Sequence, residues 1–396
     1  MARIDSHRVT SGLSAGSTRA AVRRTPGIGA PGYRRLGATR PAGSGSDPVS
    51  PGPAARWQHA WRLWVALLLL AAPMHAAHAS GEVEITPLPR PVTFMAGFKP
   101  QANLPFVAAY VAQEQGYFAE QGLDVTIHHS TGQHLQLLLS GDVDITTAAA
   151  GSVLKRRADP GVPIRAIALF GQRGQQTFIA LADSGIDSPR DWEGRTVGYR
   201  ISLPPEYLAI ADAAGVDRTQ VQEVRVGFDP RILVQGKVDV LAVFKSNEPD
   251  TIRGLGFDVV QFDPSAYGVP ALGLTYITRE ELIAAEPELI ARFLKAALKG
   301  LEFSFAHPEE TLDIVLRYAD KEDRDHMRFM LEAEQADAVS AVTDEHGLGW
   351  MTLQQWREFH DLLARYQALA REVDVEQAFT TQFLEAAYED GRLVWP

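Results

Sequence analysis

The chain has 396 residues, and its 38 lysines and arginines are outnumbered by 49 aspartates and glutamates. This length predicts about two folding units, each able to bury a substantial core. The absence of cysteine excludes disulfides, thiolate metal sites, cysteine nucleophiles and a lipid-modified N-terminal cysteine. The formal charge of −11 argues against nucleic acid as a partner, because phosphate binding needs a clustered positive surface.

The N-terminal segment differs in composition from the rest of the chain. Residues 1–55 are rich in Arg, Gly, Pro, Ser and Ala, which predicts a disordered leader; a basic RNA-binding tail, or a start codon placed too far upstream, are the alternatives. Residues 56–79 contain two arginines, the apolar run 63–72 and a final Ala-His-Ala, an order typical of a secretory signal peptide. We therefore predict cleavage near Ala79 and a periplasmic location, with an uncleaved membrane anchor as the alternative.

Strand and helix patterns alternate along the chain from residue 92 onward. Apolar runs predict strands at 92–97, 123–128, 144–147, 164–170, 178–182, 196–199, 221–226, 238–244, 259–262 and 272–277. Apolar residues at helical spacing predict helices at 106–121, 133–139, 151–158, 205–214 and 230–235, then a helical tail at 279–305, 308–318, 321–338, 352–370 and 374–389. Such alternation implies an α/β fold of parallel sheets covered by helices on both faces.

Short motifs in these segments resemble those of periplasmic solute-binding proteins that serve ABC importers. The subgroup is the one similar to the thiamine-pyrimidine synthases, which also includes binders of sulfonates and nitrate. The resemblance covers about residues 92–318, and its motifs stand at 94–100, 110–112, 116–118, 122–125, 140–145, 194–198, 235–240, 247–249, 286–296 and 307–310.

The resemblance implies a two-lobed clamshell of type II with a helical C-terminal extension. Lobe 1 would comprise residues 92–182 plus 274–396, and lobe 2 would comprise residues 183–273. Ala180–Ile186 and Gly273–Thr278 would then be the hinge segments. It also implies a monomer that binds a small molecule and delivers it to an ABC permease in the inner membrane, with no cofactor, no metal and no catalytic residues.

Ligands of parallel α/β sheets bind outside the carboxyl ends of the strands, and this rule selects the candidate binding residues. In lobe 1 the loops after the strands contain aromatic, amide, hydroxyl and cationic side chains: Phe98, Lys99, Gln101, Asn103, Thr131, Gln133, Gln172 and Arg173. In lobe 2 the corresponding loops contain Tyr199, Arg200, Phe228, Asp229, Phe244, Asn247 and Glu248. Each has a structural alternative: helix capping for Thr131, core packing for the phenylalanines and an ordinary surface position for the others.

Two observations favour a binding role for some of these residues. The only asparagines in the chain, Asn103 and Asn247, both fall in predicted cleft loops. The set is also rich in aromatic rings, amides and a carboxylate, Glu248, which suit an uncharged heteroaromatic ring better than a small oxyanion. We therefore predict a thiamine pyrimidine precursor or a riboflavin-like compound as ligand, with sulfonate or nitrate as the alternative.

Other functions fit the sequence less well. The synthases use a lysine and a histidine just after the strand that aligns with 144–147, where this chain has Ala148 and Ser152. The cysteine cluster of the family enzyme is also impossible here, so we predict a binding protein and not an enzyme. A periplasmic sensor that presents its liganded form to a receptor remains an alternative to transport.

Overall fold

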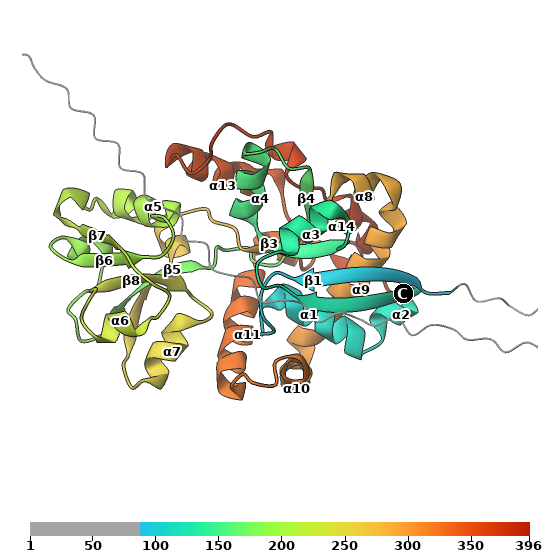
Figure 1. The fold of residues 1–396 in the computed structure, drawn as a ribbon, viewed down its shortest axis with the longest axis horizontal. Coiled ribbons are helices and arrows are strands. Elements are labelled where there is room, and N and C mark those ends of the chain that lie inside the picture. The colour runs from blue at the N-terminus through green and yellow to red at the C-terminus, as the bar shows by residue number, and fades with distance from the viewer. Residues whose placement is uncertain (1–87) are drawn as a thin grey trace, which may run out of the picture. The chain divides into compact units, whose positions relative to one another are not determined.

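A computed structural model describes residues 88–396, all of which belong to one compact unit. The predicted leader (1–55) and signal peptide (56–79) lie outside the described residues. Within residues 88–396 no helix combines the length and the apolar character that crossing a membrane requires. The described residues form two five-stranded mixed sheets, each with its own helices (Figure 1).

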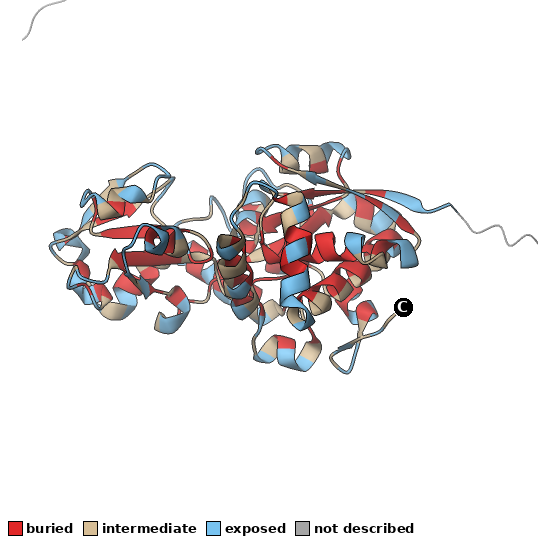
Figure 2. Ribbon diagram, turned by 90° about the horizontal axis from the view of Figure 1, so that it is seen from below, coloured by how far each residue is buried: buried red, intermediate tan, exposed pale blue. Residues whose placement is uncertain are grey.

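The first sheet has the strand order β2-β1-β3-β10-β4. Its strands are β1 (Arg90–Ala96), β2 (Leu123–His129), β3 (Ile145–Ala149), β4 (Ile164–Leu169) and β10 (Leu274–Arg279). β2, β1 and β3 are parallel, whereas β10 runs antiparallel to both β3 and β4. Its strands are almost fully buried in the middle of the sheet, as expected for a sheet with helices on both faces (Figure 2).

The helices that pack around the first sheet come from both ends of the described chain. The N-terminal group is α1 (Leu104–Glu114), α2 (Tyr117–Glu120), α3 (His134–Ser140) and α4 (Ala150–Ala158). The C-terminal group is α8 (Glu280–Ala285), α9 (Pro287–Ala306), α10 (Pro308–Tyr318), α11 (Arg324–Ala338), α12 (Ala341–His346), α13 (Leu353–Arg365) and α14 (Gln382–Ala387), with the 3-10 turn η4 (Val375–Gln377). We call this sheet and its helices lobe 1.

The second sheet, with its helices, forms lobe 2 and has the order β7-β6-β8-β5-β9. Its strands are β5 (Gln176–Leu181), β6 (Thr196–Tyr199), β7 (Gln222–Arg225), β8 (Val240–Phe244) and β9 (Val259–Phe262). Its helices are α5 (Pro205–Ala214), α6 (Arg231–Val234) and α7 (Glu248–Gly254), with 3-10 turns η1 (Pro189–Trp192), η2 (Arg218–Gln220) and η3 (Pro264–Tyr267). Trp192 and Tyr207 stack at 5.5 Å in its core, and Phe262 meets Trp192 edge to face.

The predicted parallel direction holds for four strands of each sheet, but each sheet also contains one antiparallel strand. β5 runs antiparallel to β8 and β9 in the second sheet, and β10 runs antiparallel to its neighbours in the first. Both are the first strands after the chain crosses from one lobe to the other. A chain that leaves one sheet at the carboxyl ends of its strands enters the other sheet at the same edge, so the entering strand must run the opposite way.

The chain crosses between the lobes at 170–175 and 268–273, and not at the predicted hinges Ala180–Ile186 and Gly273–Thr278. The predicted boundary after residue 182 assigns β5 to lobe 1, whereas β5 pairs with β8 and β9 of lobe 2. The two crossings lie side by side: the Gly273 N–H donates to the Gly171 carbonyl at 2.8 Å. A Cβ atom on Gly171 would lie 2.8 Å from the Gly273 Cα, so only glycine permits this approach.

Three predicted helices are interrupted. The expected helix 279–305 is divided at Glu286 into α8 and α9, which begins at Pro287. The expected helix 106–121 is divided into α1 and α2 at Gly116, which has a φ of 79°. The expected helix 374–389 is instead η4, α14 and the first strand of a short hairpin, β11 (Tyr388–Glu389) with β12 (Arg392–Leu393). The turn between these strands is Asp390-Gly391, and both residues have a positive φ, as a two-residue hairpin turn requires.

Candidate functional site

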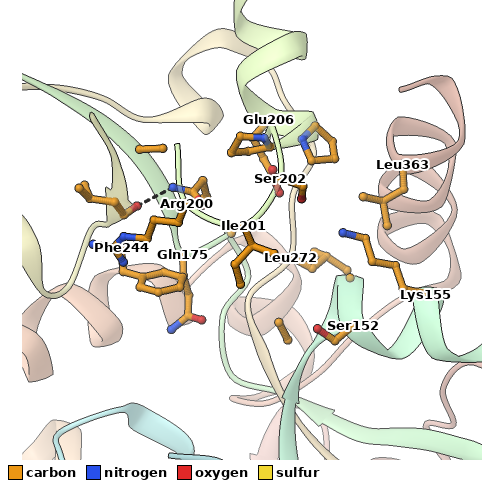
Figure 3. A pocket seen from close by; sticks show the side chains of 18 of the residues that line it. Ser152, Lys155, Gln175, Arg200, Ile201, Ser202, Glu206, Phe244, Leu272 and Leu363 are labelled. Atoms are coloured by element: carbon orange, nitrogen blue, oxygen red, sulfur yellow. Dashed lines mark hydrogen bonds between the residues drawn. The ribbon is translucent and has the colours of Figure 1, made fainter. Parts of the chain in front are cut away.

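A pocket of about 330 Å³ lies between the two lobes, at the carboxyl ends of the parallel strands. Its volume is at the lower end of the roughly 300–1,000 Å³ that ligand pockets occupy. Lobe 1 contributes residues from β3, α4 and α13, and lobe 2 contributes residues from the β6–α5 loop, the β7–α6 loop and β8. The crossings add Gly174, Gln175 and Leu272. Figure 3 shows the labelled side chains converging on this space.

The lobe 2 wall of the pocket exposes apolar side chains around a cation. Phe228 is 67% exposed, Phe244 is 44% exposed and Ile201 is 74% exposed. The Arg200 guanidinium lies 5.2 Å from the centre of the Phe228 ring and 5.8 Å from the centre of the Phe244 ring. Exposed aromatic rings grouped around a cation form a surface on which a planar ligand can stack.

Arg200 is held in place by a carboxylate behind it. Glu248 begins α7 and is 5% exposed; its Oε1 accepts from Arg200 and its Oε2 accepts from the Phe244 N–H at 2.9 Å. The Nε of Arg200 is buried and has no hydrogen-bond partner among the described residues. Glu248 therefore orients Arg200, and both of its oxygens are already engaged within the protein.

A second set of polar groups lines the pocket on the side of α4. Ser152 and Lys155 lie on α4, and Ser202 and Glu206 lie on the facing β6–α5 loop and α5 of lobe 2. Burial raises the pKa of Glu206, while hydrogen bonding to its own backbone and the charge of Lys155 act in the opposite direction. Sequence reasoning missed Glu206, because an acid in the first turn of a helix is normally interpreted as a favourable interaction with the helix dipole.

Two of the predicted candidates belong instead to a hydrogen-bond network where α11 meets lobe 2. Glu334, on α11, is 8% exposed; its Oε1 accepts from Asn103 at 2.9 Å, Ser246 at 2.9 Å and Gln175 at 3.0 Å. Gln101 in turn donates to the Asn103 side-chain oxygen. Burial raises the pKa of Glu334, which these donors counteract. The three donors come from both lobes and from a crossing, so Glu334 links all three.

The same face of α11 engages the side chains of two more candidates and one lysine. Arg173 pairs with Asp337 at 3.0 Å, and Lys245 of lobe 2 pairs with Asp337 at 2.9 Å. His326 Nε2 lies 3.0 Å from the Asn247 side-chain oxygen. The Gln172 side chain is buried within lobe 1, where it donates to the Trp350 carbonyl and accepts from Ser340 and Gln355.

The other candidates stand outside the pocket lining. Phe98 is 56% exposed and Lys99 pairs with Glu322 at 2.5 Å. Thr131 donates to Gln133 within one loop, and Tyr199 packs against the hydrophobic core. Asp229 pairs with the neighbouring Arg231 at 2.7 Å. Of the fifteen side chains that the sequence selected, the structure brings three to the pocket wall: Arg200, Phe228 and Phe244.

The amino-acid sequence and the fold were compared with those of known proteins. A family model described as NMT1/THI5 like matches residues 103–311, which is more than half of the chain. The chain belongs to the NMT1/THI5-like family. No group of three or more histidines, aspartates or glutamates able to hold a metal ion occurs within residues 88–396.

Two relatives and one solved structure are similar to this chain. The chain is 31% identical to the formylaminopyrimidine-binding protein of Halalkalibacterium halodurans, over 69% of this chain and 84% of the relative. It is 28% identical to the riboflavin-binding protein RibY of Chloroflexus aurantiacus, over 79% of this chain and 91% of the relative. The periplasmic aliphatic sulphonate binding protein SsuA from Escherichia coli has the same fold, with a TM-score of 0.58 and 13% identity over 74% of this chain and 92% of that protein.

These findings confirm the family and the two-lobed fold that the sequence motifs predicted. Both named relatives are binding proteins, which agrees with the prediction of a solute-binding protein and not an enzyme. At the positions where the synthases would need their lysine and histidine, Ala148 is a buried residue of β3 and Ser152 lines the pocket.

Proposed function

We propose that this protein is the extracytoplasmic solute-binding component of an ABC importer, and that its ligand is a small heteroaromatic compound. The observation that carries the proposal is the wall formed by Phe228 and Phe244, two exposed rings around the Arg200 guanidinium. Stacking contributes about 0.5–1.5 kcal/mol beyond the burial of apolar area. A small oxyanion gains nothing from such a surface, whereas a planar ring covers it.

The polar groups of the pocket suit the same class of ligand. Gln175 and Gln176 line the pocket, and their side-chain oxygens can accept from a ring N–H or an exocyclic amino group. Their side-chain nitrogens already donate to Glu334 and to the Val243 carbonyl, respectively. Arg200 offers its guanidinium charge beside the aromatic surface, in an orientation that Glu248 holds. The relatives named for formylaminopyrimidine and riboflavin binding support a pyrimidine precursor or a flavin as the ligand.

The direct test is calorimetric titration with hydroxymethylpyrimidine, formylaminopyrimidine, riboflavin, taurine and nitrate. We expect at least one ring compound to bind at micromolar concentration or tighter, and the two oxyanions to bind more weakly. Phe244→Ala should weaken the bound ring compound by about tenfold, the loss of one stacking contact together with its buried area. Phe257→Ala is the matched control, since Phe257 is a 40% exposed phenylalanine of lobe 2 outside the pocket. Tight binding of taurine or nitrate without any ring compound would overturn the proposal.

Location and assembly complete the proposed function. We infer that residues 56–79 are a signal peptide cleaved after Ala79, and that the mature protein acts as a monomer in the periplasm and docks on an inner-membrane permease. N-terminal sequencing of the protein from the periplasmic fraction tests the cleavage. A mature chain that still contained residues 67–70 would contradict it, and light scattering of the same material would report its oligomeric state.

A further inference from the structure

One end of the pocket is formed by α13, which lies beyond residue 311, where the family match ends. Phe359 and Leu363 line the pocket from this helix. Their side chains are 3% and 2% exposed, respectively, and both pack beside Gly151 in the first turn of α4. The Phe359 ring comes within 3.1 Å of the place where a Cβ on Gly151 would stand. The absence of a side chain at Gly151 therefore lets α13 reach the pocket.

The chemistry at this end differs from that of the aromatic wall. Lys155 and Glu206 face the pocket from opposite lobes, and neither forms an ion pair within the part of the chain that the structure describes. Two hydroxyl groups, those of Ser152 and Ser202, lie beside them. In Figure 3 Lys155 and Leu363 lie at one end of the space, and Arg200 and Phe244 lie at the other.

The α13 end also contacts lobe 2 outside the pocket. The Tyr366 hydroxyl, just after α13, donates to Asp212 of α5 at 2.6 Å, and Arg365 lies 3.5 Å from the same carboxylate. Because α5 also carries Glu206, these contacts hold α13 and Glu206 on the two sides of one compartment.

We propose that the α13 end receives a hydrogen-bonding substituent of the ligand, so that the protein selects aromatic rings that carry a polar side chain over the same rings without one. This inference rests on the proposed function, because it assumes a ring stacked at Phe228 and Phe244. Lys155 and Ser152 donate to hydroxyl or carbonyl oxygens of the substituent, and Glu206 accepts from its hydroxyl or amide groups. Phe359 and Leu363 form the apolar wall against which the carbon atoms of the substituent pack.

Two matched pairs of compounds test the proposal on the full-length mature protein. Riboflavin is compared with lumiflavin, in which a methyl group replaces the ribityl chain, and formylaminopyrimidine is compared with 4-amino-2,5-dimethylpyrimidine. We expect the substituted member of at least one pair to bind about tenfold more tightly or better, as one charge-assisted hydrogen bond predicts. Ratios near one in both pairs, with the rings still bound, would overturn this inference alone. Failure of all four compounds to bind would instead overturn the proposed function.

Variants then assign the preference to the α13 end. Lys155→Met and Glu206→Gln should each lower the ratio of affinities within the preferred pair to about threefold or less. Arg156→Met is the matched control: Arg156 is the next exposed cation on α4 and lies outside the pocket, so the ratio should keep its wild-type value. Phe359→Ala should also lower the ratio, with circular dichroism to check its fold. An unchanged ratio in both Lys155→Met and Glu206→Gln would contradict the proposal whatever the outcome for Phe359→Ala.

Discussion

The lobes meet in two regions whose polar groups are used in opposite ways. Around Glu334, side chains from both lobes satisfy one another, and the network is buried. Around the pocket, two phenylalanine rings remain exposed, and Lys155 and Glu206 form no ion pair within residues 88–396. Burying a polar group without a partner is costly, so a region that closes on itself is structural, whereas one that leaves groups unused is prepared for a ligand.

This difference explains why candidates of the same chemical kind have different roles. Asn103 and Arg200 both follow strands at the cleft, and both are polar side chains suited to recognition. Asn103 donates to Glu334, the same carboxylate that accepts from Ser246 of lobe 2, whereas Arg200 faces the pocket with Glu248 behind it. The two regions should therefore respond differently to substitution: changes at Glu334 should act on stability, and changes at Glu248 should act on both stability and ligand binding.

The largest effect is expected from Glu334→Ala. It removes the acceptor of three side-chain donors, and each buried donor left unpaired costs about 1–3 kcal/mol, so we expect a loss of about 4 kcal/mol in the free energy of unfolding. Urea denaturation measures it. Asp313→Ala, which breaks an exposed ion pair with Arg324, is the control and should cost less than about 1 kcal/mol. A similar, small loss in both variants would contradict a structural role for Glu334.

The isosteric variant Glu334→Gln probes the charge alone. Burial raises the pKa of Glu334 above its ordinary value of 4.5, so the folded state binds this proton more tightly than the unfolded state does. The wild type should therefore lose stability relative to Glu334→Gln as the pH rises from about 4.5 through the folded-state pKa. Denaturation curves between about pH 4 and about pH 8 measure the difference. A difference that stays constant, or that favours the wild type as pH rises, would contradict this assignment.

Glu248→Ala should have an intermediate effect on stability and a clear effect on binding. Removing the carboxylate leaves the partly buried Arg200 without its ionic partner, and we expect a loss of about 2–3 kcal/mol. Arg200 should also lose its orientation beside Phe244, which we expect to weaken a ring compound by about tenfold. Thermal denaturation and calorimetric titration of one preparation give both values. Ring affinity equal to that of the wild type would show that Arg200 does not need Glu248.

The smallest effect is expected from Tyr366→Phe. This change removes the hydrogen bond to Asp212 between α13 and lobe 2 and leaves the ring in place. The expected cost is below about 1 kcal/mol, seen as a slightly faster dissociation of ligand in stopped-flow experiments. Tyr117→Phe is the control, since Tyr117 lies on α2 of lobe 1 and packs edge to face against Trp395. A dissociation rate that responds equally to both variants would show that the Asp212 contact does not act on the pocket.

The sequence by itself determined the α/β class, nearly all of the strands and the family, because these depend on local apolar spacing and on short motifs. It also selected the loops at the carboxyl ends of the strands, where the pocket lies. It did not reveal that β5 joins the second sheet, since a short apolar strand such as 176–181 pairs equally well in either sheet until its neighbours are placed.

Only the tertiary structure decided which polar side chains are available to a ligand. Asn103 and Glu334 are 231 residues apart in the chain, and nothing in the sequence near either one indicates the other. The same holds for Glu206, which faces Lys155 only because α5 and α4 come from different lobes. Hydrogen bonds are satisfied between elements that are distant in sequence, and so the three-dimensional arrangement, and not local composition, determines which groups remain free to bind.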